Sequence, residues 1–162
     1  RPRHRTLGVL MSTAPSPAGK LYLVVGYDGS PPAVRALDAA VSLLRGRDGR
    51  IDVTYVAHLT PAETMSADAV AEMGEIFDEM ARDLQAQAGE QLSGREERWR
   101  FERRRGPIPE ELAAAAAKVP DSGPDDTVVV VVGSSSQAVH RMVGSVAVSL
   151  ARHAPVPVVI VP

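Results

Sequence analysis

The chain has 162 residues, which is the usual size of one domain and enough to bury a hydrophobic core. Aromatic residues make up only 4%, so the core must be built mainly from aliphatic side chains. A net charge of −2 gives no general attraction to nucleic acid or anionic membranes, and the lack of cysteine excludes disulfides, thiolate metal sites and cysteine nucleophiles. No run approaches the ~20 apolar residues that span a bilayer. We expect a cytoplasmic protein with neither a nucleic-acid nor a membrane partner.

The first residues differ in composition from the rest of the chain. Residues 1–10 are basic, and residues 12–19 are rich in proline, serine and alanine. The apolar run at residues 7–11 is shorter than the hydrophobic region of a signal peptide. We expect residues 1–19 to be a disordered N-terminal arm, with Met11 as a candidate natural start, and residues 20–162 to form one folded domain.

Hydrophobic periodicity divides the domain into alternating strands and helices. Short apolar runs that end at glycine, proline or aspartate indicate buried strands, and apolar residues three and four apart indicate helices. In chain order the pattern predicts a strand at 21–27, a helix at 31–44, a strand at 51–57, a loop at 59–66, a helix at 67–92, a strand at 98–105, a helix at 109–119, a strand at 128–132, a helix at 146–154 and a strand at 156–161. Because strands alternate with helices, we expect a parallel sheet with helices on both faces.

A valine strand followed by a glycine loop is the strongest functional signal. Residues 128–132 are all valine, and a glycine and three serines follow at 133–136. Glycine and small hydroxyl residues let the backbone turn tightly and expose its N–H groups. Gly144 and Ser145 then open a helical pattern, which adds the free amides of a helix N-terminus. The segment predicts a site for an anion.

Several stretches together resemble the universal stress protein family, namely YDGS at 27–30, IDVTYV at 51–56, RRGPIPEEL at 104–112 and the closing run from 128 to the end. The resemblance covers about 21–162. It implies a flavodoxin-like α/β fold of the adenine nucleotide alpha hydrolase-like type, with a five-stranded parallel sheet of order 3-2-1-4-5. In this order the first and fourth strands are neighbours, and ligands of open α/β sheets bind beyond the carboxyl ends of such a pair. Asp28 follows the first strand and Gly133 the fourth, so both arguments predict the same crevice.

The resemblance also implies binding residues, because many family members bind ATP through a loop of the form G-x2-G-x9-G-[ST]. The match assigns Gly133 to the first glycine, Gly144 and Ser145 to the last glycine and its hydroxyl residue, Asp28 to the acidic residue near the ribose, Ile51 to the position whose backbone meets the adenine, and Val146 to an amide at the helix start. The implied ligand is ATP or a related adenine nucleotide.

Two departures from the family pattern concern this loop. Ser136 stands where the second glycine belongs, and only seven residues separate it from Gly144. A shorter loop offers fewer inward amides, and serine enters positive-φ conformations less readily than glycine. The hydroxyl groups of Ser134 and Ser136 and the charge of Arg141 offset this, because each can meet a phosphate. No metal site is evident, so Mg²⁺ is expected only together with a nucleotide.

The same residues have a structural interpretation. Glycine and serine are common in connections from strand to helix, and an aspartate such as Asp28 before glycine is an ordinary turn former and helix cap. The leading hypothesis is a stress-response module that binds an adenine nucleotide and changes its interactions with partners. The alternative is a dimeric interaction protein that binds no nucleotide and whose glycine loop is purely structural. Efficient catalysis is not expected, because no nucleophile, base and acid are arranged for it, and any ATP hydrolysis would be slow and incidental. A true ATPase is the third alternative.

The two expected edge strands differ in charge. The strand at 98–105 carries arginines and glutamates, and we interpret these charges as a block to stray pairing at a sheet edge rather than as a nucleic-acid patch. The last strand, 156–161, is apolar, and an exposed apolar edge needs cover. Family members commonly form dimers through this strand. We therefore expect a homodimer through residues 156–161, with cover by the N-terminal arm as the alternative.

Overall fold

The computed structural model describes residues 19–162 apart from 59–64, 95–97, 121 and 135–143. Almost all of the predicted N-terminal arm therefore lies outside the described residues. The described elements, in chain order, are β1 (Leu21–Gly26), α1 (Pro31–Leu44), β2 (Gly49–Ala57), α2 (Ala67–Gln91), β3 (Trp99–Arg105), α3 (Ile108–Ala117), β4 (Thr127–Gly133), α4 (Ser145–His153) and β5 (Val158–Val161). Each corresponds to an element that the hydrophobic pattern predicts.

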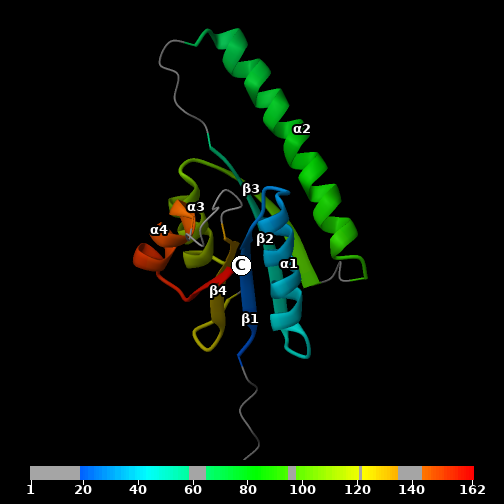
Figure 1. The fold of residues 1–162 in the computed structure, drawn as a ribbon, viewed down its shortest axis with the longest axis vertical. Coiled ribbons are helices and arrows are strands. Elements are labelled where there is room, and N and C mark those ends of the chain that lie inside the picture. The colour runs from blue at the N-terminus through cyan, green and yellow to red at the C-terminus, as the bar shows by residue number, and fades with distance from the viewer. Residues whose placement is uncertain (1–18, 59–64, 95–97, 121, 135–143) are drawn as a thin grey trace, which may run out of the picture.

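The strands form one parallel sheet of order β3-β2-β1-β4-β5 (Figure 1). β1 is the central strand, and Val25 lies opposite Val53 on β2 and Val131 on β4. This order confirms the fold class that the sequence predicts, with β3 and β5 at the two edges. It also makes β1 and β4 neighbours, although about 100 residues separate them along the chain.

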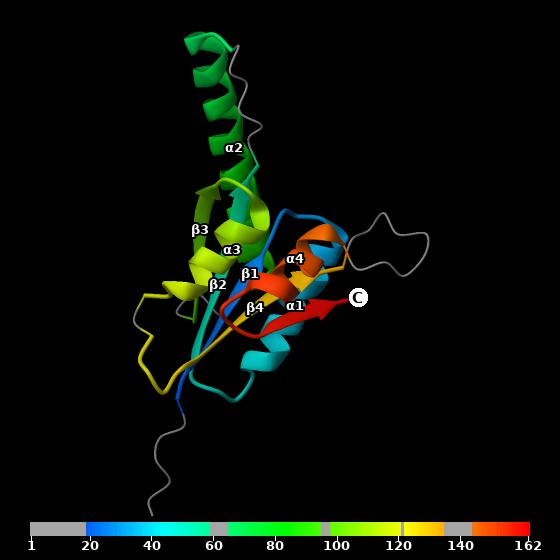
Figure 2. The ribbon, with the colours of Figure 1, turned by 90° about the vertical axis from the view of Figure 1, so that its left-hand side faces the viewer.

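Helices cover both faces of the sheet because successive side chains of a strand point to opposite faces. Leu23 and Val25 are buried on the face that carries α1 and α2, whereas Tyr22 and Val24 are buried on the face that carries α3 and α4. Figure 2 shows α3 and α4 in front of the sheet and α1 behind it. The two cores explain why β1 is apolar throughout: it has no solvent-facing side.

Helix α2 is much longer than the sheet requires. Its buried residues, Ala81, Leu84 and Ala88, all lie in its C-terminal half, and the N-terminal half extends beyond the sheet (Figure 1). Ser66 caps its start, with Oγ accepting a hydrogen bond from the Ala69 amide at 3.3 Å. Within the described part of the chain, no helix has the length and apolar character needed to cross a bilayer.

Strand β5 is shorter than the sequence predicts, since it begins at Val158 rather than at residue 156. Pro157 is one of the two residues expected to open the strand, and proline has no N–H to donate to a neighbouring strand. The carbonyl of Pro157 still accepts a hydrogen bond from the Val130 amide at 3.0 Å. Hydrogen bonding to β4 thus begins at Pro157, one residue before the start of β5.

Candidate functional site

A pocket of about 280 Å³ lies at the carboxyl ends of β1 and β4. Residues from the turn after β1, from α1, β2, α3 and β4, and from the start of α4 line it, and they include Asp28, Ser30, Thr54, Val56, Ile108, Leu112, Gly133, Ser134, Gly144, Ser145 and Val146. Asp28 and Gly133 therefore meet at one crevice, because their strands are hydrogen-bonded neighbours. This is the place where open α/β sheets bind ligands.

Asp28 lies in the tight turn that leads from β1 into α1. Its Oδ1 accepts a hydrogen bond from the Ser30 amide at 3.0 Å, and Gly29 has a φ of 75°, a left-handed conformation that favours glycine. Ser30 in turn caps α1, with Oγ accepting a hydrogen bond from the Ala33 amide at 3.4 Å. The turn engages one carboxylate oxygen of Asp28 and directs an exposed negative charge to the rim of the pocket.

The charge of Asp28 is felt by two nearby phenols. Burial raises the pKa of Tyr27, and the negative charges of Asp28 and Asp38 raise it further. The pKa of Tyr55 is also raised, first by burial and then by Asp28. Both phenols therefore stay neutral at physiological pH, and Tyr27 can donate its hydroxyl hydrogen to Gln87 Oε1 at 3.2 Å.

The residues at the end of β4 make contacts that the fold itself requires. A Cβ on Gly133 would lie 2.4 Å from the Pro32 carbonyl oxygen, so only glycine permits this approach of β4 to α1. The Ser134 amide donates to the Val161 carbonyl at 2.7 Å, which extends the pairing of β4 with β5. The Ser134 N–H is therefore not available to a ligand, and only its side chain and carbonyl can serve one.

The start of α4 brings main-chain donors to the pocket. Gly144 is its N-cap residue, with a φ of −60° and a ψ of 155°, and no side chain of a described residue caps the helix there. The first intrahelical hydrogen bond runs from the Val148 amide to the Gly144 carbonyl at 3.0 Å. The amides of Ser145, Val146 and Ala147 precede that bond, and all three residues line the pocket. An uncapped helix start that faces a pocket suits an anionic group.

The structure places one expected site residue, Ile51, outside the pocket. Ile51 lies near the start of β2, is buried in the core on the α1 side of the sheet, and does not line the pocket. Thr54 and Val56 line it instead, from the carboxyl end of the same strand and from its opposite face. The sequence did carry a signal for Thr54 and Val56, because both lie near the carboxyl end of the predicted strand. Ligands of parallel sheets bind at this end of the strands.

Two further predicted nucleotide-binding residues and the metal prediction remain. Ser136 and Arg141 lie outside the described residues. Across the described ranges, no group of three or more histidine, aspartate or glutamate side chains is arranged to hold a metal ion.

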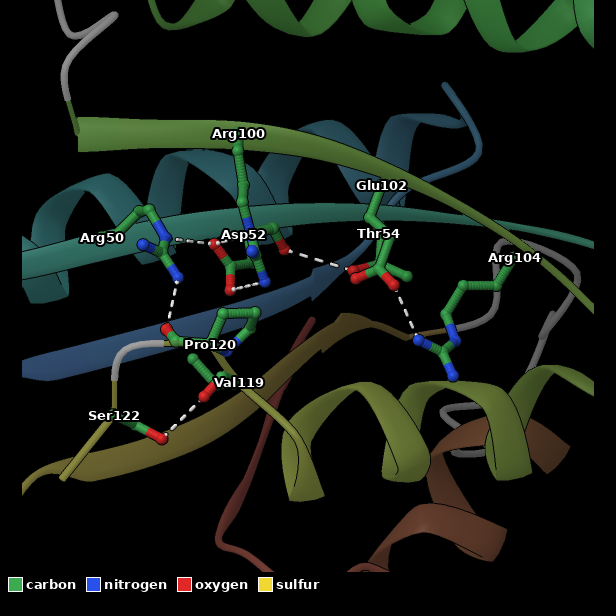
Figure 3. Close-up of polar contacts among 9 residues, drawn as sticks. All are labelled: Arg50, Asp52, Thr54, Arg100, Glu102, Arg104, Val119, Pro120 and Ser122. Carbon is green, nitrogen blue, oxygen red and sulfur yellow. Dashed lines mark hydrogen bonds and ion pairs between the residues drawn. The ribbon is translucent and has the colours of Figure 1, made fainter. Parts of the chain in front are cut away.

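Arg104 near the end of β3 pairs with Glu102 on its own strand (Figure 3) and with Glu111 on α3. Its Nε lies 2.8 Å from Glu111 Oε2, and its Nη1 lies 2.7 Å from Glu102 Oε1. Burial acts to lower the pKa of Arg104, but the hydrogen bonds and charges of Glu111 and Glu102 outweigh it and leave that pKa raised. Glu111 directly precedes Leu112, which lines the pocket. The ion pair of Arg104 with Glu111 therefore holds this turn of α3 in position beside the pocket.

A second polar cluster lies on the same face of β2 and β3, farther from the pocket. Asp52 is 1% exposed, and its Oδ1 lies 2.7 Å from Arg50 Nε and 2.8 Å from Arg100 Nε (Figure 3). Arg100 Nη2 also donates to Asp52 Oδ2 at 2.9 Å, and Arg50 Nη2 donates to the Pro120 carbonyl at 3.0 Å. The cluster ties two strands to the chain that follows α3. Sequence reasoning missed Asp52 and treated Arg100 only as an edge charge.

Comparison with known proteins adds a family and a set of similar folds. The model of the Universal stress protein family matches residues 22–162. The universal stress protein UspA from Lactobacillus plantarum is 19% identical, with 90% of this chain and 99% of that chain covered and a TM-score of 0.66. A sequence comparison with curated proteins gives no significant match.

Two further solved structures were determined with ligands. A universal stress protein in complex with cAMP is 21% identical, with 90% of this chain and 98% of that chain covered and a TM-score of 0.57. A universal stress protein family protein from Arabidopsis thaliana with AMP bound is 13% identical, with 87% of this chain and 90% of that chain covered and a TM-score of 0.56. At these identities the likeness establishes a common fold.

Proposed function

Since this chain belongs to the universal stress protein family, we propose that it binds an adenine nucleotide in the pocket between β1 and β4 and acts in stress response by changing its contacts with partner proteins. The observation that carries this proposal is the uncapped start of α4, whose first amides lie at the same pocket as Asp28. Free amides suit phosphate oxygens, and a carboxylate suits the hydroxyl groups of a ribose.

The opposite side of the pocket suits a base. Val56, Ile108, Leu112 and Val132 are apolar, and Thr54 adds one hydroxyl. Pockets for small ligands commonly combine such an apolar wall with a few polar groups. Relatives of the same fold with cAMP and AMP bound support an adenine nucleotide as the class of ligand. Within this class we propose ATP as the physiological ligand, with Mg²⁺ bound only through its phosphates.

The proposed activity is binding rather than catalysis. The described residues around the pocket offer one carboxylate, Asp28, and no histidine or cysteine as a nucleophile or base. Hydrolysis of a bound nucleotide would then be slow and incidental. We place this activity in the cytoplasm, in keeping with a chain that has no cysteine.

We further propose that the protein works as a homodimer joined through the β5 edge. Val158 and Ile160 on one face and Val159 and Val161 on the other are only partly buried, although all four are apolar. A second β5 strand would cover them and pair the outward backbone groups of this edge.

A nucleotide-independent interaction protein is the second candidate, and a specific observation favours it. Gly133 is required by its contact with Pro32, and the Ser134 amide is used within the sheet. Both features of the loop are thus explained without a ligand. The two candidates differ in one measurable property, which is the response of the folded protein to a nucleotide.

Thermal unfolding of the full chain with AMP, cAMP, ADP and ATP tests the proposal. A ligand that binds only the folded state and is present at about 100 times its Kd stabilises that state by about 2.7 kcal/mol. For a domain of this size the Tm then rises by several degrees. Calorimetric titration of the same ligands gives the affinities, and GTP reports whether the base is recognised.

Asp28→Asn is the informative variant, because its amide oxygen can still accept the Ser30 hydrogen bond while the charge is lost. We expect roughly tenfold weaker nucleotide binding with an unchanged Tm of the free protein. Asp125→Asn is the matched control, since Asp125 is exposed and outside the pocket. Absence of any Tm shift at millimolar nucleotide would favour the nucleotide-independent candidate.

A further inference from the structure

The N-terminal half of α2 carries an apolar stripe that the described part of the chain leaves largely exposed. Val70, Ile76 and Met80 are 57%, 54% and 46% exposed, and Met73 lies between them at helical spacing. These three make up most of the large hydrophobic side chains that the described residues expose. The stripe lies on the part of the helix that extends away from the sheet (Figures 1 and 2). Concentrated apolar exposure of this kind marks a contact surface for another molecule.

The stripe continues a face that is already used for packing. Farther along the helix, Ala81, Leu84 and Ala88 lie on the same side and are buried against the sheet. No side chain of residues 67–80 is fully buried. Phe77 packs against the core and Met80 Sδ accepts a hydrogen bond from Tyr55 Oη at 3.1 Å, whereas Val70 and Ile76 stay more than half exposed. A helix segment this short gains little stability from its backbone alone.

The polar face of the same segment is strongly acidic. Six carboxylates and one arginine lie between residues 67 and 83. Three pairs of carboxylates are spaced four residues apart, at 68 and 72, at 75 and 79, and at 79 and 83. Like charges at this spacing face each other on a helix and destabilise it. Of these carboxylates, Asp78 forms ion pairs with Arg103 and Arg105 on β3. The segment therefore combines an exposed apolar stripe with an excess of negative charge.

We propose that residues 67–80 of α2 form a docking surface for a basic amphipathic helix of a partner protein. Apolar residues of that helix would cover Val70, Met73 and Ile76, and its lysines or arginines would lie against the flanking carboxylates. Methionine side chains adapt to partners of different shape, which suits Met73 and Met80 to this role. Binding of such a helix would cover the exposed apolar surface and would reduce the repulsion between the carboxylates. Both changes lower the free energy of the segment.

Charge also argues against a second copy of this chain as the occupant. Two α2 helices packed stripe against stripe would bring two acidic segments together, and neither has the basic residues to offset them. This docking surface lies at the β3 side of the sheet, whereas the proposed dimer contact lies at β5. It also does not depend on the nucleotide pocket, so each proposal can fail without the other.

Labelled model peptides titrated into the full chain test the surface. The probe is a leucine–lysine peptide of about five helical turns with leucines at helical spacing. We expect it to bind, to bind more weakly as salt is raised, and to slow amide hydrogen exchange in residues 67–80. A peptide of the same composition in scrambled order and a leucine–glutamate peptide should bind at least about tenfold more weakly.

Variants of the protein locate the contact. Val70→Ser combined with Ile76→Ser should weaken binding by about tenfold or more, because two apolar contacts are lost from an exposed surface without disturbing the core. Glu72→Gln, Glu75→Gln and Glu79→Gln together should weaken binding and flatten its dependence on salt. Leu43→Ser combined with Val148→Ser changes exposed apolar residues on other helices and should leave binding unchanged.

Three results would overturn the proposal. Equal binding of the scrambled peptide would mean that only charge attracts it. Full affinity in the Val70→Ser, Ile76→Ser variant, or exchange protection outside residues 67–80, would place the contact elsewhere. An oligomer of the free chain that dissociates when Val70 and Ile76 are changed would show that a second copy is the occupant.

Discussion

A Cβ at position 133 would lie 2.4 Å from the carbonyl oxygen of Pro32. The end of β4 and the first turn of α1 are therefore in direct contact through their backbones, at the edge of the candidate pocket. Because Pro32 is held by a ring and by the start of a helix, this backbone has little freedom to move aside. Gly133 is required by the fold whether or not a nucleotide binds.

Gly133→Ala should destabilise the protein by about 1–3 kcal/mol in urea unfolding, because the added methyl group overlaps the Pro32 backbone. Gly74→Ala is the matched control. Gly74 lies within α2, and a Cβ there would meet nothing within 4 Å, so this variant should gain about 0.5–1 kcal/mol. Equal midpoints for Gly133→Ala and the unaltered protein would contradict the contact.

Asp52→Asn should cost about 2–3 kcal/mol in the free energy of unfolding. It removes the buried charge that two guanidinium groups share, and the loss stays moderate because both arginines reach solvent. Asp78→Asn is the comparison, because Asp78 is half-exposed beside Arg103 and Arg105 and its loss should cost at most about 1 kcal/mol. Similar small losses in both variants would show that the Asp52 cluster adds no stability.

Tyr27 should make stability fall at alkaline pH. Burial, together with the charges of Asp28 and Asp38, raises its pKa in the folded protein above the value of 10.0 in an open chain. The unfolded chain then loses the proton first, so the contribution of Tyr27 is complete below pH 10.0 and is lost as the pH rises through its folded-state pKa. Urea unfolding between about pH 8 and 11 measures this.

Tyr27→Phe should flatten this alkaline decline, because the phenylalanine side chain does not titrate. Asp28→Asn should lower the pKa of Tyr27, since it removes one of the charges that raise it. Near-ultraviolet absorbance follows the phenol directly. An unchanged decline in Tyr27→Phe would assign the alkaline effect to another group.

Val158→Pro should separate the proposed dimer from the fold. The Pro157 and Val161 carbonyls accept hydrogen bonds from β4, so by strand alternation the backbone groups of Val158 point to the open side of β5. Proline at this position removes an outward N–H and leaves the pairing with β4 intact. Light scattering should change from a dimer to a monomer of 17.2 kDa with little change in Tm. Persistence of the dimer would place the subunit contact elsewhere.

Local sequence patterns predicted the helices and strands well. In the helices apolar residues recur at helical spacing, and in the buried strands they form continuous runs. The apolar run of β1 is buried on both faces, and the valines of β4 fit the same role. The predicted boundaries differ from those observed by one or two residues. One difference of two residues is at the start of β5, where Pro157 lacks the N–H that pairing of this residue would use.

Ligand-facing residues were harder to predict because their identity depends on strand register. Thr54 and Val56 face the pocket and Ile51 does not, although all three belong to one strand. Positions a few residues apart on β2 differ in two ways. They lie at different ends of the strand, and an odd difference in residue number between two positions places their side chains on opposite faces of the sheet. Only the observed pairing of β2 with β1 places Thr54 beside Gly26, at the end of the sheet where the pocket lies.

Hydrophobic periodicity, the glycine loop and the family motifs were sufficient to derive a parallel sheet with one crevice beyond β1 and β4, because these features are local in sequence. Asp52 meets Arg100, and Gly133 meets Pro32, across separations of 48 residues and more. Such contacts arise only when strand register and helix packing bring distant segments together. The tertiary structure therefore decided which polar groups are satisfied within the fold and which, at the start of α4, have no partner among the described residues.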